Sequence, residues 1–454
     1  MAGFRSLLRN RSFVSLAIAG AGSFAAPTAS LVVLLYSIAT TFAHAPHPIE
    51  QGALALAFLG LSSTVPTLLT AVFSGTIADR SDRRHLMRWS NLAALLATAA
   101  VLSLLYLKPG TPVALFGHAD FYFPEWILLL YPLWAVETTS VTLFRPAFNA
   151  ALPRLVDRAS LGRANGLVYA TALAFSIGGS LLAGYVADVD SAAVALVVPV
   201  VLFLTTQLFL TGVEGSLSPP APEDRPPFLA EAKAGYRFLW ERRPLLVLTF
   251  AALAINFFSA VAFVELGLYV VVWLAVNQAL LVGAMMAGGS LGAAVGTLLI
   301  NRFRFERRAG RILFLLVVLQ GASVAVLGLV HTIWLALPDM FLFGVFPGMF
   351  TTVFLATIQA TVPNQILGRV LAADEVGSFA MIPVGQYVGG SITAAAGIPA
   401  AYLIAGGGTV VVGTLMGLYP GVRTLGFEPT EEPVDHSGGL TPAGLPPSEQ
   451  GLAE

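Results

Sequence analysis

Long apolar stretches alternate with short polar breaks along almost the whole chain. Each stretch is continuously apolar, whereas the strands of a membrane barrel alternate apolar and polar residues. A helix of ~20 apolar residues crosses a hydrocarbon core of ~30 Å. The pattern therefore predicts an all-α membrane protein with twelve transmembrane helices, over residues 13–42, 52–77, 86–107, 126–148, 166–187, 192–213, 245–272, 278–300, 312–330, 333–360, 370–395 and 398–419.

The longest break before the tail divides the pattern into two sets of six. This break is charged and rich in proline, and its second part places Phe228, Tyr236, Leu239 and Trp240 at helical spacing. Such a segment is typical of an amphipathic helix on a membrane surface. The tail is rich in Pro, Gly and Glu, which favours disorder. We predict an N-terminal six-helix bundle, a cytoplasmic linker, a C-terminal six-helix bundle and a disordered cytoplasmic tail, at residues 1–213, 214–243, 244–424 and 425–454.

Composition and charge indicate location and orientation. Of the 454 residues, 56% are hydrophobic and 11% are charged, whereas ~25% charged residues are usual in soluble domains. Nearly all of the 24 Lys and Arg residues fall in alternate breaks, beginning with Arg5, Arg9 and Arg11. Because basic loops stay in the cytoplasm, we predict a multi-pass protein of the cell membrane with both termini cytoplasmic. The first stretch exceeds the ~7–15 apolar residues of a signal peptide, so we interpret it as a retained helix.

The sequence lacks the residues on which most enzymes and metal sites depend. It contains no cysteine, which excludes disulfides and thiolate chemistry. His44 and His47 lie in a proline-containing outer loop without a third ligand, and we interpret them as solvated. The sequence contains no phosphate-binding loop and no nucleophile triad. We expect no metal, no cofactor, no nucleic-acid partner and no enzymatic activity.

A dense basic turn follows the second apolar stretch. Its sequence is Gly75-Thr-Ile-Ala-Asp79-Arg80-Ser-Asp82-Arg83-Arg84. In spacing, charge and membrane context, this turn resembles the signature of the major facilitator superfamily of secondary transporters. A weaker copy follows the eighth stretch at residues 301–308. The resemblance implies two homologous six-helix bundles that rock about a shared central cavity.

The same resemblance implies that the basic turn is a gate. Asp79 would face the positive N-terminus of the eleventh helix, near Arg369 to Ala372, in the outward-open state. The alternative is that the arginines only hold the loop in the cytoplasm. Arg145, inside the fourth stretch, either takes part in the gate or anchors its helix at the membrane surface. The candidate gating residues are Gly75, Asp79, Arg80, Arg83, Arg84 and Arg145.

Three carboxyl groups lie inside the apolar stretches, at Glu137, Glu265 and Asp339. A charge at the bilayer centre costs ~2.5–3.5 kcal/mol on insertion scales, so such residues are candidates for function. Removal from water favours the neutral carboxyl group, which suits reversible protonation during transport. The resemblance places all three residues on helices that line the central cavity. For Glu265 and Asp339, the alternative is a hydrated, structural position near the outer surface.

Other polar and aromatic residues also have two interpretations. Asp374 and Glu375 lie at the start of the eleventh stretch, where acidic residues complement the helix dipole. The alternative for these two residues is a part in the gate. The candidate substrate contacts are Tyr36, Trp134, Asn256 and Phe257, and for each of them the alternative is packing.

Further segments resemble a drug-exporter group that contains macrolide-efflux and siderophore-exporter proteins. These segments are Arg145-Pro146-Ala147-x-x-Ala150-x-Leu152-Pro153 and Gly235-Tyr-Arg-Phe-Leu-Trp-x-x-Arg243-Pro244. In addition, Gly178-Gly179-Ser180-x-x-x-Gly184 resembles the glycine-rich antiporter motif of the superfamily, with Ser180 where that motif usually has proline.

The leading hypothesis is secondary active efflux of amphiphilic small molecules, neutral or cationic, driven by the proton gradient. The excess of acidic groups inside the stretches disfavours anionic substrates. An importer, or a lipid or siderophore transporter of the same fold, is the alternative, because the motif does not encode direction. A non-transporting membrane scaffold or sensor is a more remote alternative. We expect a monomer whose partners are its small-molecule substrate and the lipid bilayer.

Overall fold

The computed structural model describes most of the chain. The described residues are 7–45, 47–108, 112–114, 122–157, 160–214, 217, 228–303 and 306–426. Residues 427–454 of the predicted tail and residues 215–216 and 218–227 of the predicted linker lie outside these residues.

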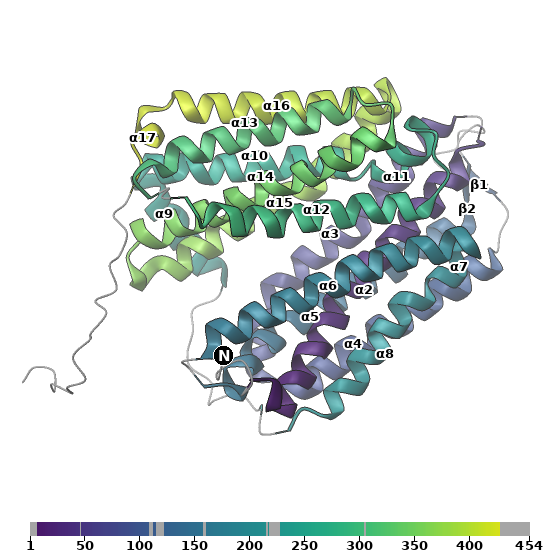
Figure 1. Ribbon diagram of the computed structural model, residues 1–454, viewed down its shortest axis with the longest axis horizontal. Helices are drawn as coiled ribbons and strands as arrows, with labels where there is room; N and C mark the ends of the chain where they lie inside the picture. Colours follow the sequence, from purple (N-terminus) through teal and green to yellow (C-terminus); the bar gives the residue numbers. More distant parts are fainter. Residues whose placement is uncertain are drawn as a thin grey trace, which may run out of the picture.

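Twelve long helices in the described residues form two bundles of six, which confirms the predicted fold (Figure 1). The first bundle contains α2 (Arg11–Phe42), α3 (Pro48–Arg80), α4 (Arg83–Leu107), α5 (Glu125–Leu155), α6 (Leu161–Val189) and the pair α7 (Ala192–Ala195) and α8 (Val197–Thr211). The second bundle contains α10 (Arg243–Phe263), α12 (Ala279–Ile300), α13 (Ala309–Leu327), α14 (Ile333–Thr361), α15 (Asn364–Ala396) and α16 (Ile398–Leu418).

Short elements lie at the two ends of the bundles. The strands β1 (Pro112–Ala114) and β2 (Tyr122–Pro124) lie with α7 at one end, here named the hairpin face (Figure 1). The N-terminus, α9 (Phe228–Glu241) and α17 (Pro420–Arg423) lie at the opposite end, here named the terminal face. Three further elements are α11 (Leu266–Leu268), the π-helix η2 (Tyr269–Trp273) and the 3-10 helix η3 (Glu306–Arg308).

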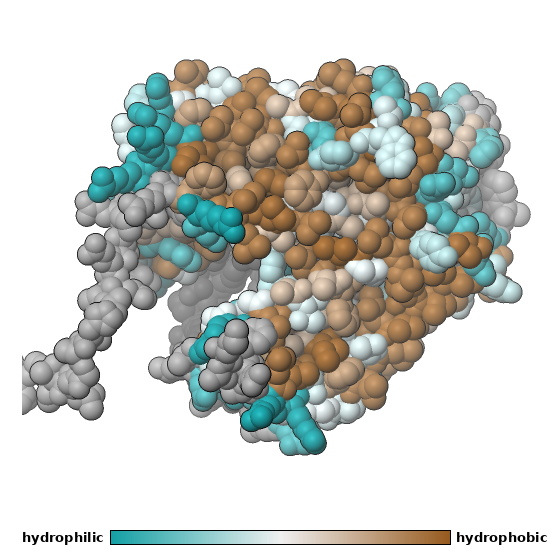
Figure 2. Space-filling view, in the orientation of Figure 1, coloured by the Kyte–Doolittle hydropathy of each residue, from teal (hydrophilic) through white to brown (hydrophobic). Residues whose placement is uncertain are grey.

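The surface of the helices is apolar between the two faces. Hydrophobic side chains cover the middle of both bundles, and hydrophilic ones gather toward the ends (Figure 2). By length and composition, eleven helices among the described residues are apolar enough to cross a membrane. The remaining long helix, α15, carries Arg369 and Asp374 in its first half and Gln386 in its second.

The two bundles touch toward the hairpin face and separate toward the terminal face (Figure 1). One cluster of buried apolar residues includes both bundles near the hairpin face, for example Leu34 and Tyr269. Near the terminal face, each bundle has its own cluster, around Phe148 in the first and Leu313 in the second. The space-filling view shows a notch between the bundles at this face (Figure 2). The structure is therefore closed at the hairpin face and open at the terminal face.

The predicted seventh helix, continuous over 245–272, is wrong. The α-helix α10 ends at Phe263, and the chain continues through Glu265, α11 and the π-helix η2. A Cβ atom on Gly267 would lie 2.5 Å from the carbonyl oxygen of Leu35 in α2, so the backbones are in close contact here. Ala275, with φ 54°, reverses the chain before α12. π-Helical turns occur often at functional sites.

Two other local features were not predicted. The sixth membrane segment is interrupted at Leu196, because Pro199 has no N–H to donate to Ala195 in a continuous helix. A two-stranded antiparallel sheet joins α4 to α5, with Val113 opposite Phe123. The Phe123 ring is buried, and its centroid lies 5.4 Å from that of Phe42 in α2. This contact anchors the hairpin to the first bundle.

The predicted amphipathic helix is present as α9. Leu239 is buried, whereas Trp240 is 60% exposed and has the Arg243 guanidinium 5.1 Å from its ring centroid. Gly235 packs directly against the backbone of Arg369, so α9 is docked on α15. Its apolar side therefore packs against protein.

Candidate functional site

Glu137 lies in the middle of α5 and is enclosed by the first bundle. It is 1% exposed, and its Oε2 atom lies 2.8 Å from Oγ1 of Thr98 in α4. Ser30 of α2 lies beside the same carboxyl group. Within the described residues, Oε1 has no hydrogen-bond partner. The expectation that Glu137 lines an open central cavity is therefore wrong for this conformation, in which α2, α4 and α5 surround it.

The hydrogen bonds of Thr98 indicate whether Glu137 carries a proton. Thr98 Oγ1 lies 2.8 Å from the carbonyl oxygen of Ala94 as well as 2.8 Å from Glu137 Oε2. A hydroxyl group carries one hydrogen, and a carbonyl oxygen or an ionised carboxylate can only accept. Both contacts are complete together only when Glu137 carries a proton. An ionised carboxylate here would be buried without a counter-charge, at a cost of several kcal/mol.

The second bundle contains a larger polar cluster, which we name the C-terminal cluster and which consists of Glu265, Tyr269, Ser323, Asp339 and Tyr402. Glu265 is fully buried, and neither of its carboxyl oxygens has a partner among the described residues. Ser323 Oγ of α13 donates to Asp339 Oδ1 of α14 at 3.0 Å. The rings of Tyr269 and Tyr402 are 4.8 Å apart.

The C-terminal cluster tests one alternative interpretation of its acids. Glu265 is 0% exposed and Asp339 is 9% exposed. The alternative of a hydrated position near the outer surface is therefore wrong for Glu265. Asp339 keeps only slight contact with solvent. Tyr402 of α16 lies near Glu265, and Tyr269 of η2 lies near Asp339.

The four candidate substrate contacts do not converge on one cavity. Tyr36 donates from its hydroxyl group to Asn277 Oδ1 at 3.0 Å, at the contact between the bundles. Trp134 is 3% exposed in the apolar core. In α10, Phe257 packs edge-on against Phe258, with centroids 5.0 Å apart, and Asn256 is half-buried. Their positions favour packing for Trp134 and a bundle contact for Tyr36.

The predicted gate is described only in part. The side chains of Gly75, Asp79 and Arg80 lie outside the described residues, so the contact predicted for Asp79 stays a prediction. The helix that Asp79 was expected to face begins at Asn364, and a helix N-terminus near Arg369 is therefore wrong. The first turns of α15 are polar and precede the apolar stretch, so the hydropathy pattern did not predict them.

The remaining arginines of the gate contact the first bundle. Asp82 caps α4, since its Oδ1 accepts from the backbone N–H of His85 at 3.0 Å. Arg83 is 5% exposed and donates from Nη1 to the carbonyl oxygen of Ala150 in α5 at 3.3 Å. Arg84 is half-buried. Arg83 therefore joins the turn to α5 in addition to marking the side of the membrane.

Arg145 is exposed on α5 and lies over an aromatic ring of α2. Its guanidinium carbon is 5.3 Å from the centroid of Phe24, a cation–π distance. This contact is compatible with both interpretations of Arg145, as a gating residue and as an anchor.

The dipole interpretation of Asp374 and Glu375 is wrong. The first turn of α15 contains no acidic residue, since the helix begins at Asn364. Asp374 is half-buried and faces α9, and the side chain of Glu375 is not described. Burial, and in second place the Asp374 carboxylate, raises the pKa of Tyr236 in α9. Asp374 therefore lies at the contact between α9 and α15.

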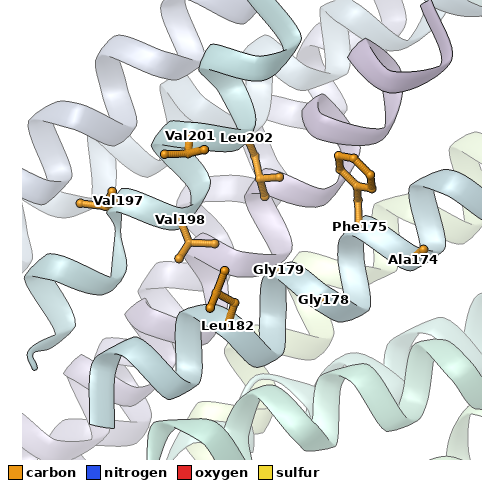
Figure 3. Close-up of a pocket in the computed structure, with 9 residues that line it drawn as sticks. All are labelled: Ala174, Phe175, Gly178, Gly179, Leu182, Val197, Val198, Val201 and Leu202. Atoms are coloured by element: carbon orange, nitrogen blue, oxygen red, sulfur yellow. The ribbon is translucent and has the colours of Figure 1, made fainter. Parts of the chain in front are cut away.

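A groove of about 460 Å³ lies between α6 and α8 (Figure 3). Phe175 and Leu182 line it from α6, and Val198, Val201 and Leu202 line it from α8. Leu182 and Val201 are about half exposed, at 51% and 50%. Its lining has no charged side chain, so this groove is distinct from the carboxyl sites. The described residues also contain no group of three acidic or histidine side chains that could hold a metal ion.

Sequence analysis did not identify Thr98, Ser323, Tyr269 or Tyr402. Serine and threonine inside helices usually bond to their own backbone, so their presence gives no signal. The tyrosines lie within apolar stretches, where they look like packing residues. The one available signal was Gly267 two residues after Glu265, an acid and a glycine that together indicate an irregular helix.

The chain is similar to known transporters along most of its length. A family model described as transmembrane secretion effector matches residues 24–429. The uncharacterized MFS-type transporter YfiS of Bacillus subtilis (strain 168) is 24% identical over 378 residues, which cover 80% of this chain and 84% of the relative.

Solved structures show the same fold. The nucleoside transporter NupG has a TM-score of 0.71 at 10% identity, covering 89% of this chain and 98% of that one. The peptide transporter PepTSo has a TM-score of 0.65 at 14% identity, covering 90% of this chain and 97% of that one. At these identities, the likeness concerns the fold alone.

Proposed function

Since the chain belongs to the transmembrane secretion effector family of major facilitator transporters, we propose that it is a proton-coupled exporter of amphiphilic small molecules, neutral or cationic. The finding that carries this proposal is the geometry of Glu137. A transporter driven by protons requires a buried group that is stable with a proton and can be exposed to water after rearrangement. Glu137, with its contact to Thr98, meets the first requirement.

The orientation that we propose follows from charge. The terminal face carries the basic segments, so it is cytoplasmic under the positive-inside rule. Both termini then lie in the cytoplasm, and the protein spans the cell membrane. With this orientation the structure is open to the cytoplasm and closed to the outside. The export step begins from such a state, because substrate enters from the cytoplasm.

Alternating access connects the carboxyl groups to transport. When the bundles rock, contacts at the hairpin face break and water reaches the interior from outside. One elementary charge that crosses 100 mV releases ~2.3 kcal/mol. At ~1.4 kcal/mol per tenfold ratio, one proton supports a roughly fifty-fold gradient of a neutral substrate. A single carboxyl group is therefore sufficient.

The substrate class follows from charge and from the family. Three acids, Glu137, Glu265 and Asp339, lie within the membrane segments, whereas Arg145 is exposed near the terminal face. This balance favours neutral or cationic molecules over anions. The family description, transmembrane secretion effector, supports the export direction. Import, or transport of lipids or siderophores, is the competing assignment that the experiment below distinguishes.

The domain organisation that we propose has two bundles at 1–213 and 244–424, joined by a linker that contains α9. The chain acts as a monomer in the bilayer, without a metal or organic cofactor. Each bundle is a rigid unit in this scheme, and α9 moves with the second bundle because it is docked on α15.

The experiment is transport by the purified protein in proteoliposomes with an imposed pH gradient. The probes are a fluorescent cationic dye, a macrolide and a siderophore, each tested with the gradient, without it and with a protonophore. We expect uptake of the dye or macrolide into vesicles that contain inside-out protein and are acidic inside, and its loss with the protonophore. Flux of every probe at the same rate without a gradient would contradict proton coupling, and flux in the reverse sense would contradict export.

A further inference from the structure

Asp188 is the penultimate residue of α6, yet its carboxylate contacts the other bundle. Oδ1 accepts a hydrogen bond from the backbone N–H of Ala279 at 2.6 Å, and Oδ2 accepts one from the N–H of Leu280 at 2.9 Å. Ala279 is the first residue of α12, and the side chain of the preceding Gln278 makes no capping hydrogen bond. The first N–H groups of a helix have no partner within it, and they carry a partial positive charge. Asp188 therefore caps α12 from the opposite bundle.

The backbones of α6 and α12 are in close contact beside this cap. A Cβ atom on Gly184, one turn before Asp188, would lie 2.7 Å from the carbonyl oxygen of Ala279. On α12, a Cβ atom on Gly283 would collide with the carbonyl oxygen of Ser180. Ser180 and Gly184 belong to the glycine-rich segment of α6. These residues permit a close approach that holds the cap in place.

A second contact between the bundles lies next to the cap. The Tyr36 hydroxyl group of α2 donates to Asn277 Oδ1, two residues before α12, at 3.0 Å. Tyr36 is also within electrostatic range of Asp188. Residues from α2 and α6 thus both contact the start of α12.

From these contacts, we infer that Asp188 is the residue that holds the two bundles closed at the hairpin face. When the bundles separate at this face, the cap is lost and the first N–H groups of α12 are exposed. The arrangement corresponds to the one predicted for Asp79, an acid at the end of α3 that faces the start of α15 at the opposite face. One acid per face would then stabilise each of the two end states. This inference rests on alternating access in the proposed function, but it requires neither proton coupling nor export.

The absence of cysteine makes a direct test possible. Ser180 is 2% exposed, at the contact between α6 and α12, and Ser180→Cys changes one atom. A charged, membrane-impermeant thiol reagent labels this position only when the hairpin face opens. The variants, each in the Ser180→Cys background, are Asp188→Ala, Asp188→Asn and Tyr36→Phe. The matched control is Asp190→Asn, because the Asp190 carboxylate accepts its one hydrogen bond among the described residues from Ser191 Oγ, at 3.1 Å.

In proteoliposomes without substrate, we expect Asp188→Ala to raise the labelling rate roughly fivefold, the usual size of a lost helix cap. Asp188→Asn keeps a good capping side chain without the charge, so the rise is smaller, and Tyr36→Phe raises the rate about threefold. Asp190→Asn has no effect. If Asp188→Ala and Asp188→Asn both label at the parent rate, the inference is wrong. If Asp188→Ala does not fold, Asp188→Asn alone tests the inference. A labelling rate above that of the parent supports it, and an unchanged rate contradicts it.

The result is separable from the proposed function because labelling requires neither a gradient nor a substrate. Faster labelling together with gradient-independent flux would support the role of Asp188 and contradict proton coupling. An unchanged labelling rate together with gradient-driven flux would contradict the role of Asp188 and support proton coupling.

Discussion

Each bundle buries one hydroxyl–carboxyl pair between its third and fourth long helices. In the first bundle, the pair is Thr98 of α4 and Glu137 of α5, at 2.8 Å. In the second bundle, it is Ser323 of α13 and Asp339 of α14, at 3.0 Å. The two bundles therefore share this local chemistry, although Asp339 lies nearer the start of α14 than Glu137 lies to the start of α5.

The surroundings of the two pairs differ in burial. The single hydrogen of Thr98 has two acceptors, the Ala94 carbonyl oxygen and Glu137 Oε2. The single hydrogen of Ser323 also has two, the backbone oxygen of Asp339 at 3.2 Å and its Oδ1 at 3.0 Å. In each pair, both contacts are complete together only when the carboxyl group carries a proton. Glu137 is 1% exposed and Asp339 is 9% exposed, so we expect the larger effect of substitution in the first bundle.

The largest effect is expected from Glu137→Gln. The amide keeps the size of the side chain and a donor for Thr98, but it cannot release a proton. Accumulation driven by 100 mV should fall from a roughly fifty-fold ratio to about one. The measurement is the steady-state ratio of a neutral substrate in proteoliposomes under an imposed gradient, beside substrate exchange without a gradient, which should persist.

The matched control is Glu125→Gln at the exposed start of the same helix. It should accumulate the same neutral substrate to the wild-type ratio. An unchanged ratio in Glu137→Gln would show that the first bundle does not carry the proton.

The next effect concerns the two acids of the second bundle. Glu265→Gln and Asp339→Asn should each lower the accumulation ratio by less than about threefold, because the other acid remains in the same bundle. The double variant should lower the ratio by more than the product of the two single effects, as expected for groups that share surroundings. Steady-state ratios of the four proteins test this. A single substitution as severe as Glu137→Gln would move the coupling site to the second bundle.

The fold was predictable because membrane segments have a strong, local signal. A continuous apolar stretch predicted all twelve helices, most to within a few residues of their ends. The prediction was wrong where packing between helices overrides the local signal. It was also wrong where a helix continues past its apolar stretch. Glu265 and Gly267 lie in an apolar stretch, but contact with α2 bends the chain there. The first turns of α15 are polar, so their helix was counted from 370 and not from Asn364.

The candidate site was predictable only by residue type. An acid within an apolar stretch is unusual enough to identify Glu137, Glu265 and Asp339. Their partners are ordinary residues in sequence, and only the register of α4 against α5 brings Thr98 to Glu137. Asp188 lies one residue beyond the predicted fifth stretch at 166–187, and it was not identified because a helix cap supplied by another bundle has no signature in sequence.

A smaller effect is expected from removing the hydroxyl partners. Thr98→Val keeps the branched shape but leaves Glu137 without its partner, at a cost of ~1–3 kcal/mol for a buried polar group. Ser323→Ala should cost about half as much, because Asp339 is 9% exposed and Glu137 only 1%. The measurement is the apparent unfolding temperature in detergent, with an expected decrease of ~2 °C for Thr98→Val. A larger decrease for Ser323→Ala would reverse the ranking of the two pairs.

The smallest effect distinguishes two tyrosines, the half-buried Tyr131 of the first bundle and the buried Tyr269 of the second. Tyr131 donates from its hydroxyl group to the Ala55 carbonyl oxygen at 3.1 Å, so Tyr131→Phe should lower stability by ~1 kcal/mol. The hydroxyl group of Tyr269 is buried without a partner among the described residues, and its ring packs on Tyr402. Tyr269→Phe keeps this packing and removes an unpaired polar group, so unfolding in detergent should show equal or slightly higher stability. If Tyr269→Phe destabilises the protein as much as Tyr131→Phe, the Tyr269 hydroxyl group must pair with a neighbouring acid, and the C-terminal cluster would then be a connected network comparable to the Thr98–Glu137 pair.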